Sequence, residues 1–411
     1  MAVDPNWGEF VETVQNDELS VASRLDRLPI SSFHRRIMWI LGFVVFFDFA
    51  DTNSFAYAAP AILKFWRLPI STIAQVTSAT FLGMFVGATV GGWLSDRIGR
   101  KKALILTTLW YGAASLLDAF VWGTTSLLVV RLLTGVGISA MTVVGMTYIS
   151  EMFPSKYRGS YQGWVMTIGL CGIPVTAYIA RFCIPAVPWG WRLVFVWGSL
   201  SILFPFLAGY LEESPRWYEK HGRLREAEAA LVRIESVVER EVGSLPPLPM
   251  SSATPSSSGR YRHLLTRAYF PRTLELSLTW ICQTLGFFGF TSWVPTLLVA
   301  HGFSLVHSLA WSSVMSIAAV PGALIAALLA DHWDRRWWIT VFALLIAVCG
   351  LTYGLTFRVT IIIIFGFLVE LFLHTLNPLL YAYTAECYPT EIRNSGTGLT
   401  YGAGRLANAF G

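Results

Sequence analysis

Apolar runs of about 20 residues recur along the whole chain, and they constrain its fold more than any other feature. Each run is long enough to cross a hydrocarbon core of about 30 Å as a helix. Charged residues make up only 13% of the sequence, whereas a soluble domain carries roughly 25%. The runs predict an all-α polytopic membrane protein with spans at 37–58, 72–94, 103–121, 127–149, 160–180, 192–211, 274–298, 308–330, 338–356, 360–383 and 395–411.

The basic residues follow the topology of these spans. Lys and Arg gather in alternate loops, at 96–102, 155–158, 212–273 and 334–336. The loops at 118–126 and 301–307 contain neither. This alternation is the positive-inside pattern, and it accounts for the net charge of +5 without a nucleic-acid partner. It predicts an integral protein of the plasma or inner membrane with a cytoplasmic N-terminus.

A long polar segment divides the spans into two groups. Its first part, 223–242, is rich in helix-forming residues with Glu and Arg on the exposed faces. Its second part, 243–259, is rich in Pro and Ser and is typical of a flexible linker. We therefore expect a cytoplasmic amphipathic N-terminus, a six-helix half, a cytoplasmic helical segment with a linker, and a second half, at 1–36, 37–211, 212–273 and 274–411.

The second group of spans repeats the first. The segment GGWLSDRIGRKK (91–102) has an echo in AALLADHWDRRW (326–337), and EMFPSKYRGS (151–160) has one in ECYPTEIRNS (386–395). One offset of 235 residues relates Asp96 to Asp331, Arg100 to Arg335, Glu151 to Glu386 and Arg158 to Arg393. Both copies of each motif face the same side, so the repeat is parallel, about an axis normal to the membrane.

The repeat also predicts how complete the second half is. At this offset Gly411 falls opposite Thr176, inside the fifth span of the first half. We therefore expect about 11 of 12 spans, with the second half truncated in its fifth span, as in a fragment or a shortened gene product.

These motifs resemble those of the major facilitator superfamily, whose fold has two six-helix halves. GWLSDRIGRKK (92–102) matches its loop signature, and RLLTGVG (131–137) is similar to its fourth-span element. ESPRW (213–217) resembles a sugar-porter signature, and DFADT (48–52) resembles the first-span pattern of the metabolite and aromatic-acid:proton symporters. The resemblance implies a monomeric secondary transporter that works by alternating access, driven by the proton gradient without a cofactor.

Two departures from the family pattern fall in the loops. Glu212 stands where the sugar-porter signature has Pro, and His332 and Asp334 stand where the loop signature has Arg and Gly. The second-half gate is therefore expected to be looser.

Asp48 and Asp51 are the leading candidates for proton coupling. They are three residues apart and share a helix face, at depths of about 16 and 21 Å from the inner edge. Arg131 lies about 24 Å from the same edge and can meet Asp51. A buried carboxylate whose contact with Arg opens and closes could bind and release a proton. The alternative is a static buried ion pair.

Two further acidic residues, Glu370 and Asp118, lie in or at the ends of predicted spans. Glu370 lies inside the tenth span, where it could be a second proton or substrate site or a polar contact to a neighbouring helix. Asp118 is interpreted only as an outer helix end.

A larger set of residues is predicted to form the cytoplasmic gate. Asp96, Arg97 and Arg100 are expected to latch onto charges such as Glu151 and Arg158. Gly83, Gly87 and Gly91 predict close approach of two helices. The full predicted gate comprises Gly92, Asp96, Arg97, Gly99, Arg100, Glu151, Arg158, Glu213, Arg216, Asp331, Arg335, Glu386 and Arg393.

The predicted substrate-binding residues are polar or amphipathic side chains inside spans. They are Asn53, Gln75, Trp164, Gln283, Trp293, Asn377 and Tyr381. Asn377–Pro378 is expected to break the tenth helix, and an aromatic lining that includes Trp280 would suit a planar ring. His374 is interpreted as a core histidine, with a proton relay as the alternative.

Several classes of function lack their motifs here. The sequence has no Walker A loop and no GxSxG, and its five cysteines form no CxxC pair or metal-spaced cluster. We therefore expect a protein that is not an enzyme and binds no metal. The favoured function is proton-coupled symport of a small organic metabolite: an aromatic or other monocarboxylic acid, or a sugar-like solute. The alternatives are a transporter-like sensor or scaffold and a proton antiporter that exports small molecules.

Overall fold

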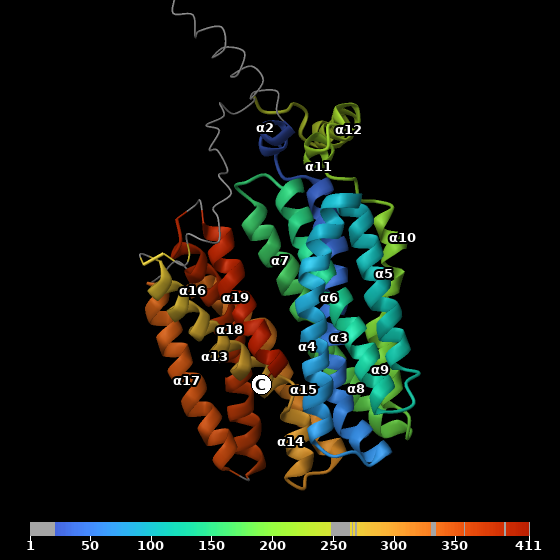
Figure 1. Cartoon of the computed structure of the whole chain (residues 1–411), viewed down its shortest axis with the longest axis vertical. Helices are drawn as coiled ribbons and strands as arrows, with labels where there is room; N and C mark the ends of the chain where they lie inside the picture. The colour runs from blue at the N-terminus through green and yellow to red at the C-terminus, as the bar shows by residue number, and fades with distance from the viewer. Residues whose placement is uncertain are drawn as a thin grey trace, which may run out of the picture.

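A computed structural model describes residues 21–247, 264, 266–267, 269–329, 334–356, 358–389 and 392–410. Within these ranges the chain is helical, with no strand, as the sequence predicts. The helices form two bundles that stand side by side (Figure 1).

The first bundle contains six transmembrane passes. Its elements are α3 (Ser32–Trp66), α4 (Ser71–Ile98), α5 (Arg100–Asp118), α6 (Thr124–Met152), α7 (Arg158–Leu170), α8 (Gly172–Ala186), α9 (Trp191–Gly198), the 3₁₀ helix η1 (Ser199–Leu203) and α10 (Phe204–Ala208). The short helices α2 (Val21–Asp26) and α11 (Pro215–Lys220) and the longer, amphipathic α12 (Leu224–Val242) lie at one end of it.

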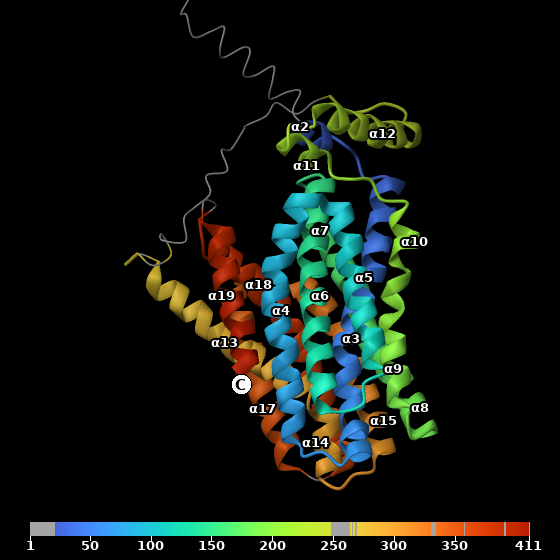
Figure 2. The same cartoon turned by 45° about the vertical axis from the view of Figure 1, so that its right-hand side comes forward.

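The second bundle contains both long helices and shorter helical segments. Its elements are α13 (Phe270–Thr291), α14 (Val294–Ala300), α15 (Leu305–Ser316), α16 (Ala319–Leu329), α17 (Arg335–Leu355), α18 (Val359–Glu386) and α19 (Arg393–Phe410). The bundles meet where α14 packs on α3, α15 on α8, and α19 on α4 (Figures 1 and 2).

The predicted spans are present, but several are segmented. Eight helical segments of the described chain are long and apolar enough to cross a membrane. Helices α5, α13 and α19 run beside them (Figure 2). The fifth span is divided at Cys171 and the seventh at Ser292–Trp293. Apolar length alone could not predict these breaks, because the residues on either side remain apolar.

Two predicted boundaries need correction. The first span begins at Ser32 and not near residue 37, so Arg35 and Arg36 belong to the first turns of α3. The predicted break at Asn377–Pro378 is wrong, because α18 runs without interruption through Pro378. Proline removes only one helical hydrogen bond, and packing on both sides can hold the helix together. Most of the predicted linker lies outside the described residues.

Helices α4 and α6 approach each other closely, as the glycine spacing predicts. A Cβ atom added at Gly83 would collide with the carbonyl oxygen of Leu132, and one at Gly87 with that of Val136. Only glycine allows the two backbones to come this near. The contact fixes α6 against α4 and so fixes the height of Arg131 in the bundle.

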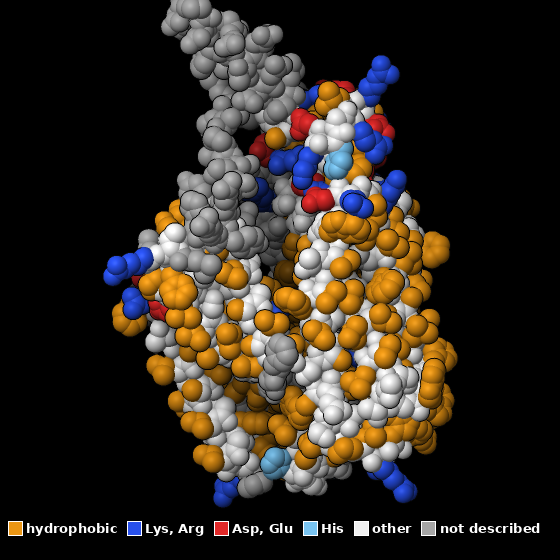
Figure 3. All heavy atoms as spheres, in the orientation of Figure 1, with side chains coloured by type: hydrophobic (Ala, Val, Ile, Leu, Met, Phe, Trp, Pro, Cys, Tyr) orange, Lys and Arg blue, Asp and Glu red, His pale blue; other side chains and the backbone are white. Residues whose placement is uncertain are grey.

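Charged side chains gather at the end that carries α2, α11 and α12 (Figure 3). Apolar side chains cover the flanks of both bundles in the same view, as expected for a surface that faces lipid. We call the first region the charged end. Here Arg24 of α2 and Arg27, the residue after α2, form ion pairs with Glu235 of α12, at 2.6 and 2.7 Å. This pairing attaches the N-terminal helix to the segment between the bundles.

Burial of Glu235 alone would raise its pKa, but hydrogen bonds from Arg24 and Arg27 outweigh burial and hold the pKa below its ordinary value. The ion pairs therefore stabilise the docked α2 at pH values above the ordinary carboxylate pKa, and this contribution disappears as the pH falls through the lowered value.

Replacing Glu235 with Gln removes the carboxylate charge, so it should remove the same stabilisation of docked α2 at neutral pH. We expect the protection of the α2 amides against hydrogen exchange to fall roughly 5- to 30-fold. Glu239→Gln, an exposed change on the same helix, is the control. Unchanged protection in Glu235→Gln would show that α2 docks through its apolar residues.

Candidate functional site

A buried charge cluster joins α3, α5 and α6 in the first bundle. The Nη1 atom of Arg131 lies 3.3 Å from an oxygen of Asp51 and 3.4 Å from an oxygen of Asp118. The hydroxyl groups of Ser115 and Thr134 donate to Asp51 and Asp118 respectively. The three charged side chains are at most 2% exposed. The cluster therefore holds two carboxylates and one guanidinium away from solvent.

The predicted contact between Asp51 and Arg131 is present, and its coupling role stays a prediction. The interpretation of Asp118 as a mere helix end is wrong. Asp118 is the last residue of α5, yet its side chain is fully buried and bonded to Arg131. Arg192 donates to the carbonyl groups of Ala119 and Val121, which holds the end of α5 inside the bundle. Position at a helix end does not reveal such an inward turn.

The charges of this cluster do not balance when both carboxylates are ionised. One guanidinium neutralises one carboxylate, and a second buried negative charge is costly. A proton on either carboxylate removes the excess charge. Oδ1 of Asp118 and Nε of Arg131 have no hydrogen-bond partner among the described residues, so the arrangement is not fully satisfied. The cluster can thus exist in two protonation states that differ by one charge.

Asp48 lies one helical turn from Asp51, nearer the boundary between the bundles. Its carboxylate accepts hydrogen bonds from Thr142 at 2.8 Å and from Thr52 at 3.5 Å. The positive charge of Arg405, on α19 of the second bundle, acts on it through space. The sequence interpretation overlooked Arg405, although a lone arginine in the middle of a span was a sufficient signal.

Glu370 occupies a separate polar group inside the second bundle. Nδ1 of His374 lies 2.9 Å from the backbone oxygen of Glu370 and 3.3 Å from its carboxylate. The charge of the Glu370 carboxylate also acts through space on Tyr57 of α3 and on Tyr353 of α17. Both His374 and Glu370 are buried. The structure does not bring Glu370 into the Asp51 cluster, and its role in coupling stays a prediction.

The predicted gate forms a compact network at the charged end. Arg100 is 4% exposed and donates to Glu151 at 2.8–3.0 Å and to Asp96 at 2.8 Å. Glu213 accepts hydrogen bonds from the backbone amides of Arg100 and Lys101, at 2.7 and 3.0 Å. The network ties the loop between α4 and α5 to α6 and to the start of α11.

Some predicted gate residues take other positions. Arg97 lies over the ring of Trp93, 4.5 Å from its centroid, and Arg216 pairs with Asp26 of α2 at 3.3 Å. Arg158 is exposed and forms no ion pair within the described part of the chain, so its place in the latch is wrong. The buried Arg100 already fills the position between Asp96 and Glu151, which leaves Arg158 outside.

The second bundle repeats the central ion pair of the gate. Arg335 contacts Glu386, the residues that the 235-residue offset relates to Arg100 and Glu151. Asp331 lies outside the described residues, and so does the side chain of Arg393. The sequence repeat is therefore also a repeat of contacts.

Two glycines of the loop signature should respond differently to substitution by alanine, one with a loss of stability and the other without. Gly99 has φ of +99°, and an added Cβ would collide with the carboxylate of Glu213. Gly92 is helical, and an added Cβ would meet nothing within 4 Å. We expect Gly99→Ala to destabilise the protein by about 1–3 kcal/mol and Gly92→Ala to be neutral or stabilising by up to about 1 kcal/mol. Thermal unfolding in detergent measures both. Equal effects would contradict the strained turn at Gly99.

The structure groups only some of the predicted substrate-binding residues. Gln283 donates to Asn377 at 3.4 Å, and Tyr381 packs on Trp280 with ring centroids 4.6 Å apart. These residues lie on α13 and α18 of the second bundle.

The other predicted residues lie elsewhere. Asn53 donates to the carbonyl group of Phe49 on its own helix, Gln75 is exposed on α4, and Trp164 is 56% exposed on α7. Trp293 packs against an apolar cluster in the first bundle.

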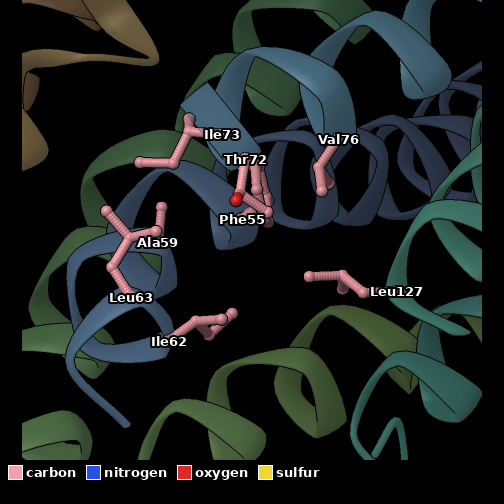
Figure 4. A pocket seen from close by; sticks show the side chains of 8 residues that line it. All are labelled: Phe55, Ala59, Ile62, Leu63, Thr72, Ile73, Val76 and Leu127. Carbon is pink, nitrogen blue, oxygen red and sulfur yellow. The ribbon is translucent and has the colours of Figure 1, made fainter. Parts of the chain in front are cut away.

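A small pocket near the end of the first bundle away from α12 is apolar. Thr72 supplies the single polar side chain of its lining (Figure 4). The lining residues are Phe55, Ala59, Ile62, Leu63, Thr72, Ile73, Val76 and Leu127. No charged group faces this space, so it is a gap in the packing of α3, α4 and α6 and not a site for a polar substrate.

Comparison with known proteins agrees with this architecture. The sequence profile described as Major Facilitator Superfamily matches residues 41–411. The chain belongs to the Major Facilitator Superfamily. The putative metabolite transport protein YyaJ of Bacillus subtilis (strain 168) is 46% identical over 394 residues, which cover 95% of this chain and 87% of that protein.

The chain is also similar to a transporter that is named for its substrate and to a transporter of known structure. The niacin transporter NiaP of Acinetobacter baylyi is 30% identical over 94% of this chain and 88% of that protein. A partially occluded, inward-open structure of the xylose transporter XylE from E. coli has a TM-score of 0.72 at 17% identity, over 92% of this chain and 90% of that one. This major facilitator protein is therefore a membrane-embedded transporter for small molecules and not an enzyme.

Proposed function

We propose that this transporter carries a small monocarboxylic acid, aromatic or otherwise, together with a proton. The observation that carries the proposal is the buried cluster of Asp51, Asp118 and Arg131. Its two carboxylates share one guanidinium, so the cluster can gain and lose one proton without leaving the bundle. Asp48 lies one turn away and provides a third buried carboxylate, which accepts a hydrogen bond from Thr142 of α6.

The choice of an acid is supported by relatives and by charge balance. NiaP is named for niacin, an aromatic monocarboxylic acid. Entry of such an anion against an inside-negative potential costs about 2.3 kcal/mol per 100 mV, whereas entry with one proton is electroneutral. A proton carried on a buried carboxylate supplies this balance, and the transporter then needs no cofactor beyond the proton gradient. A sugar-like solute is the alternative that the test must separate.

The proposed orientation follows from the basic loops. The charged end, with α2, α11 and α12, would face the cytoplasm, because Lys and Arg gather in the loops on that side. The network of Arg100, Asp96 and Glu151 would then close the cytoplasmic gate during alternating access. We propose a monomer as the transporting unit.

Internal pH in proteoliposomes tests the proposal. Benzoate, nicotinate and a sugar are added in turn to liposomes that contain the purified protein and a trapped pH-sensitive dye. Acids also cross lipid in the uncharged form, so empty liposomes and the Asp51→Asn variant set the baseline. Acidification above this baseline with an acid supports symport. Alkalinisation would indicate antiport, and no response to any compound would contradict proton coupling.

A further inference from the structure

Arg405 is a cation inside the bundles that forms no ion pair with any described residue, although the charge of Asp48 acts on it through space. Its Nε donates to the hydroxyl of Tyr401 at 2.9 Å, and its Nη1 donates to the hydroxyl of Ser139 at 3.0 Å. Both partners are neutral, and no carboxylate of the described residues lies within ion-pair distance of it. A guanidinium held in this way inside a membrane is costly and indicates a function.

Aromatic rings surround one side of this arginine. Trp280, Tyr381 and Tyr401 form a cluster in which every pair of rings is in contact, with centroids 4.6–5.0 Å apart. The guanidinium carbon lies 4.9 Å from the centroid of Tyr401. The indole nitrogen of Trp280 is already bonded to Thr384 at 3.0 Å. Since Tyr381 is 41% exposed, the cluster keeps a ring surface that another planar group could cover.

The opposite wall belongs to the first bundle. Ser139 and Thr142 are three residues apart on α6, so they share a face, and Thr142 donates to Asp48. Arg405 reaches this wall from α19, which packs between α4 and α13 (Figure 2). The hydrogen bond from Arg405 to Ser139 therefore bridges the two bundles beside Asp48, whose part in proton coupling belongs to the proposed function.

We infer that Arg405 is the receptor for the carboxylate of the transported acid, whose planar ring packs against Trp280, Tyr381 and Tyr401. This inference rests on the proposed symport of a monocarboxylic acid and assigns the acid its place. The planar guanidinium matches a carboxylate with two parallel hydrogen bonds, which a single hydroxyl such as that of Ser139 cannot supply. The aromatic cluster favours a flat, apolar remainder over a sugar ring.

The same geometry connects substrate binding with the proton. A carboxylate that takes over Nη1 of Arg405 releases Ser139 and so breaks a contact between the bundles. It also brings a negative charge opposite Asp48, whose carboxylate now experiences the positive charge of Arg405. Uptake of a proton relieves the repulsion between two carboxylates. Binding of the acid would thus favour both proton uptake and movement of the bundles.

Equilibrium binding of benzoate and benzamide to the purified protein tests the assignment. The two compounds have nearly the same shape, but only benzoate carries a charge, so the ratio of their dissociation constants isolates the carboxylate. We expect the native protein to bind benzoate about 10- to 100-fold more tightly, because a charge-assisted pair replaces a neutral one. In Arg405→Gln this ratio should fall close to one, with the affinity for benzamide retained.

Arg181→Gln is the matched control, since Arg181 is a half-buried arginine on α8 that lies in neither the charge cluster nor the aromatic cluster. It should keep the native ratio. Elution profiles and unfolding temperatures of all variants show whether each is folded. If Arg405→Gln does not fold, Tyr401→Phe replaces it, because loss of the hydroxyl that orients Nε should lower the ratio several-fold while the ring remains.

Three results would overturn the assignment: equal binding of both compounds by the native protein, no binding of benzoate to it, or the native ratio in a folded Arg405→Gln. These measurements use no proton gradient, so they can fail separately from the proposed symport. Selective binding of benzoate that depends on Arg405, in a protein that moves no protons, would retain the carboxylate receptor and refute the coupling.

Discussion

Replacing Asp51 with Asn is expected to abolish proton-driven accumulation of the transported acid, while exchange of internal for external acid continues. The substitution removes the excess carboxylate and leaves Asp118 with Arg131, so the buried cluster is neutral and the protein should fold. A cluster fixed in one charge state can still alternate with substrate bound, but it cannot carry a proton. Accumulation and counterflow of labelled benzoate in the same proteoliposomes measure the two activities.

Asp118→Asn is the matched comparison for this variant. It makes the same charge change at the same guanidinium and likewise leaves a neutral pair, here Asp51 with Arg131. Because this cluster is also fixed in one charge state, we expect Asp118→Asn to lose accumulation and to retain exchange as well. Full accumulation in Asp51→Asn would disprove its role, and loss in Asp118→Asn alone would assign coupling to Asp118.

Replacing Arg131 with Ala should have the largest effect on stability. Two buried carboxylates would then face each other without a counter-charge, and removal of one partner from a buried ion pair costs about 3–5 kcal/mol. The double substitution Asp51→Asn/Asp118→Asn in the Arg131→Ala background should recover much of this loss, because it removes the uncompensated charges.

Thermal unfolding in detergent measures this effect, with Arg181→Ala as a control outside the cluster. An unfolding temperature for Arg131→Ala as high as that of the control would show that the cluster is not a compact charged unit. The same conclusion would follow if the neutral triple variant were no more stable than Arg131→Ala.

Much of the fold follows from the sequence for simple reasons. Apolar length predicts the spans, and the 235-residue offset predicts that Arg335 contacts Glu386 as Arg100 contacts Glu151. The glycine spacing predicts the close approach of α4 and α6. Depth along a helix, at 1.5 Å per residue, predicts the meeting of Asp51 with Arg131.

Other parts of the site depend on packing that no local pattern records. The inward turn at Asp118 is held by the distant Arg192. The place of Arg405 opposite Ser139 depends on how the two bundles meet, and helix periodicity says nothing about that. The continuous α18 shows that packing outweighs the local preference of Pro378 to break a helix.

Infrared difference spectroscopy of the purified protein tests the central claim most directly. The claim is that the cluster of Asp51, Asp118 and Arg131 gains and loses one proton. On a change of pH, the native protein should show a carboxylic-acid C=O band that appears as the medium is acidified, and Asp51→Asn should lack this band. An identical band in Asp51→Asn, or no band in the native protein across the pH range of transport, would contradict the claim.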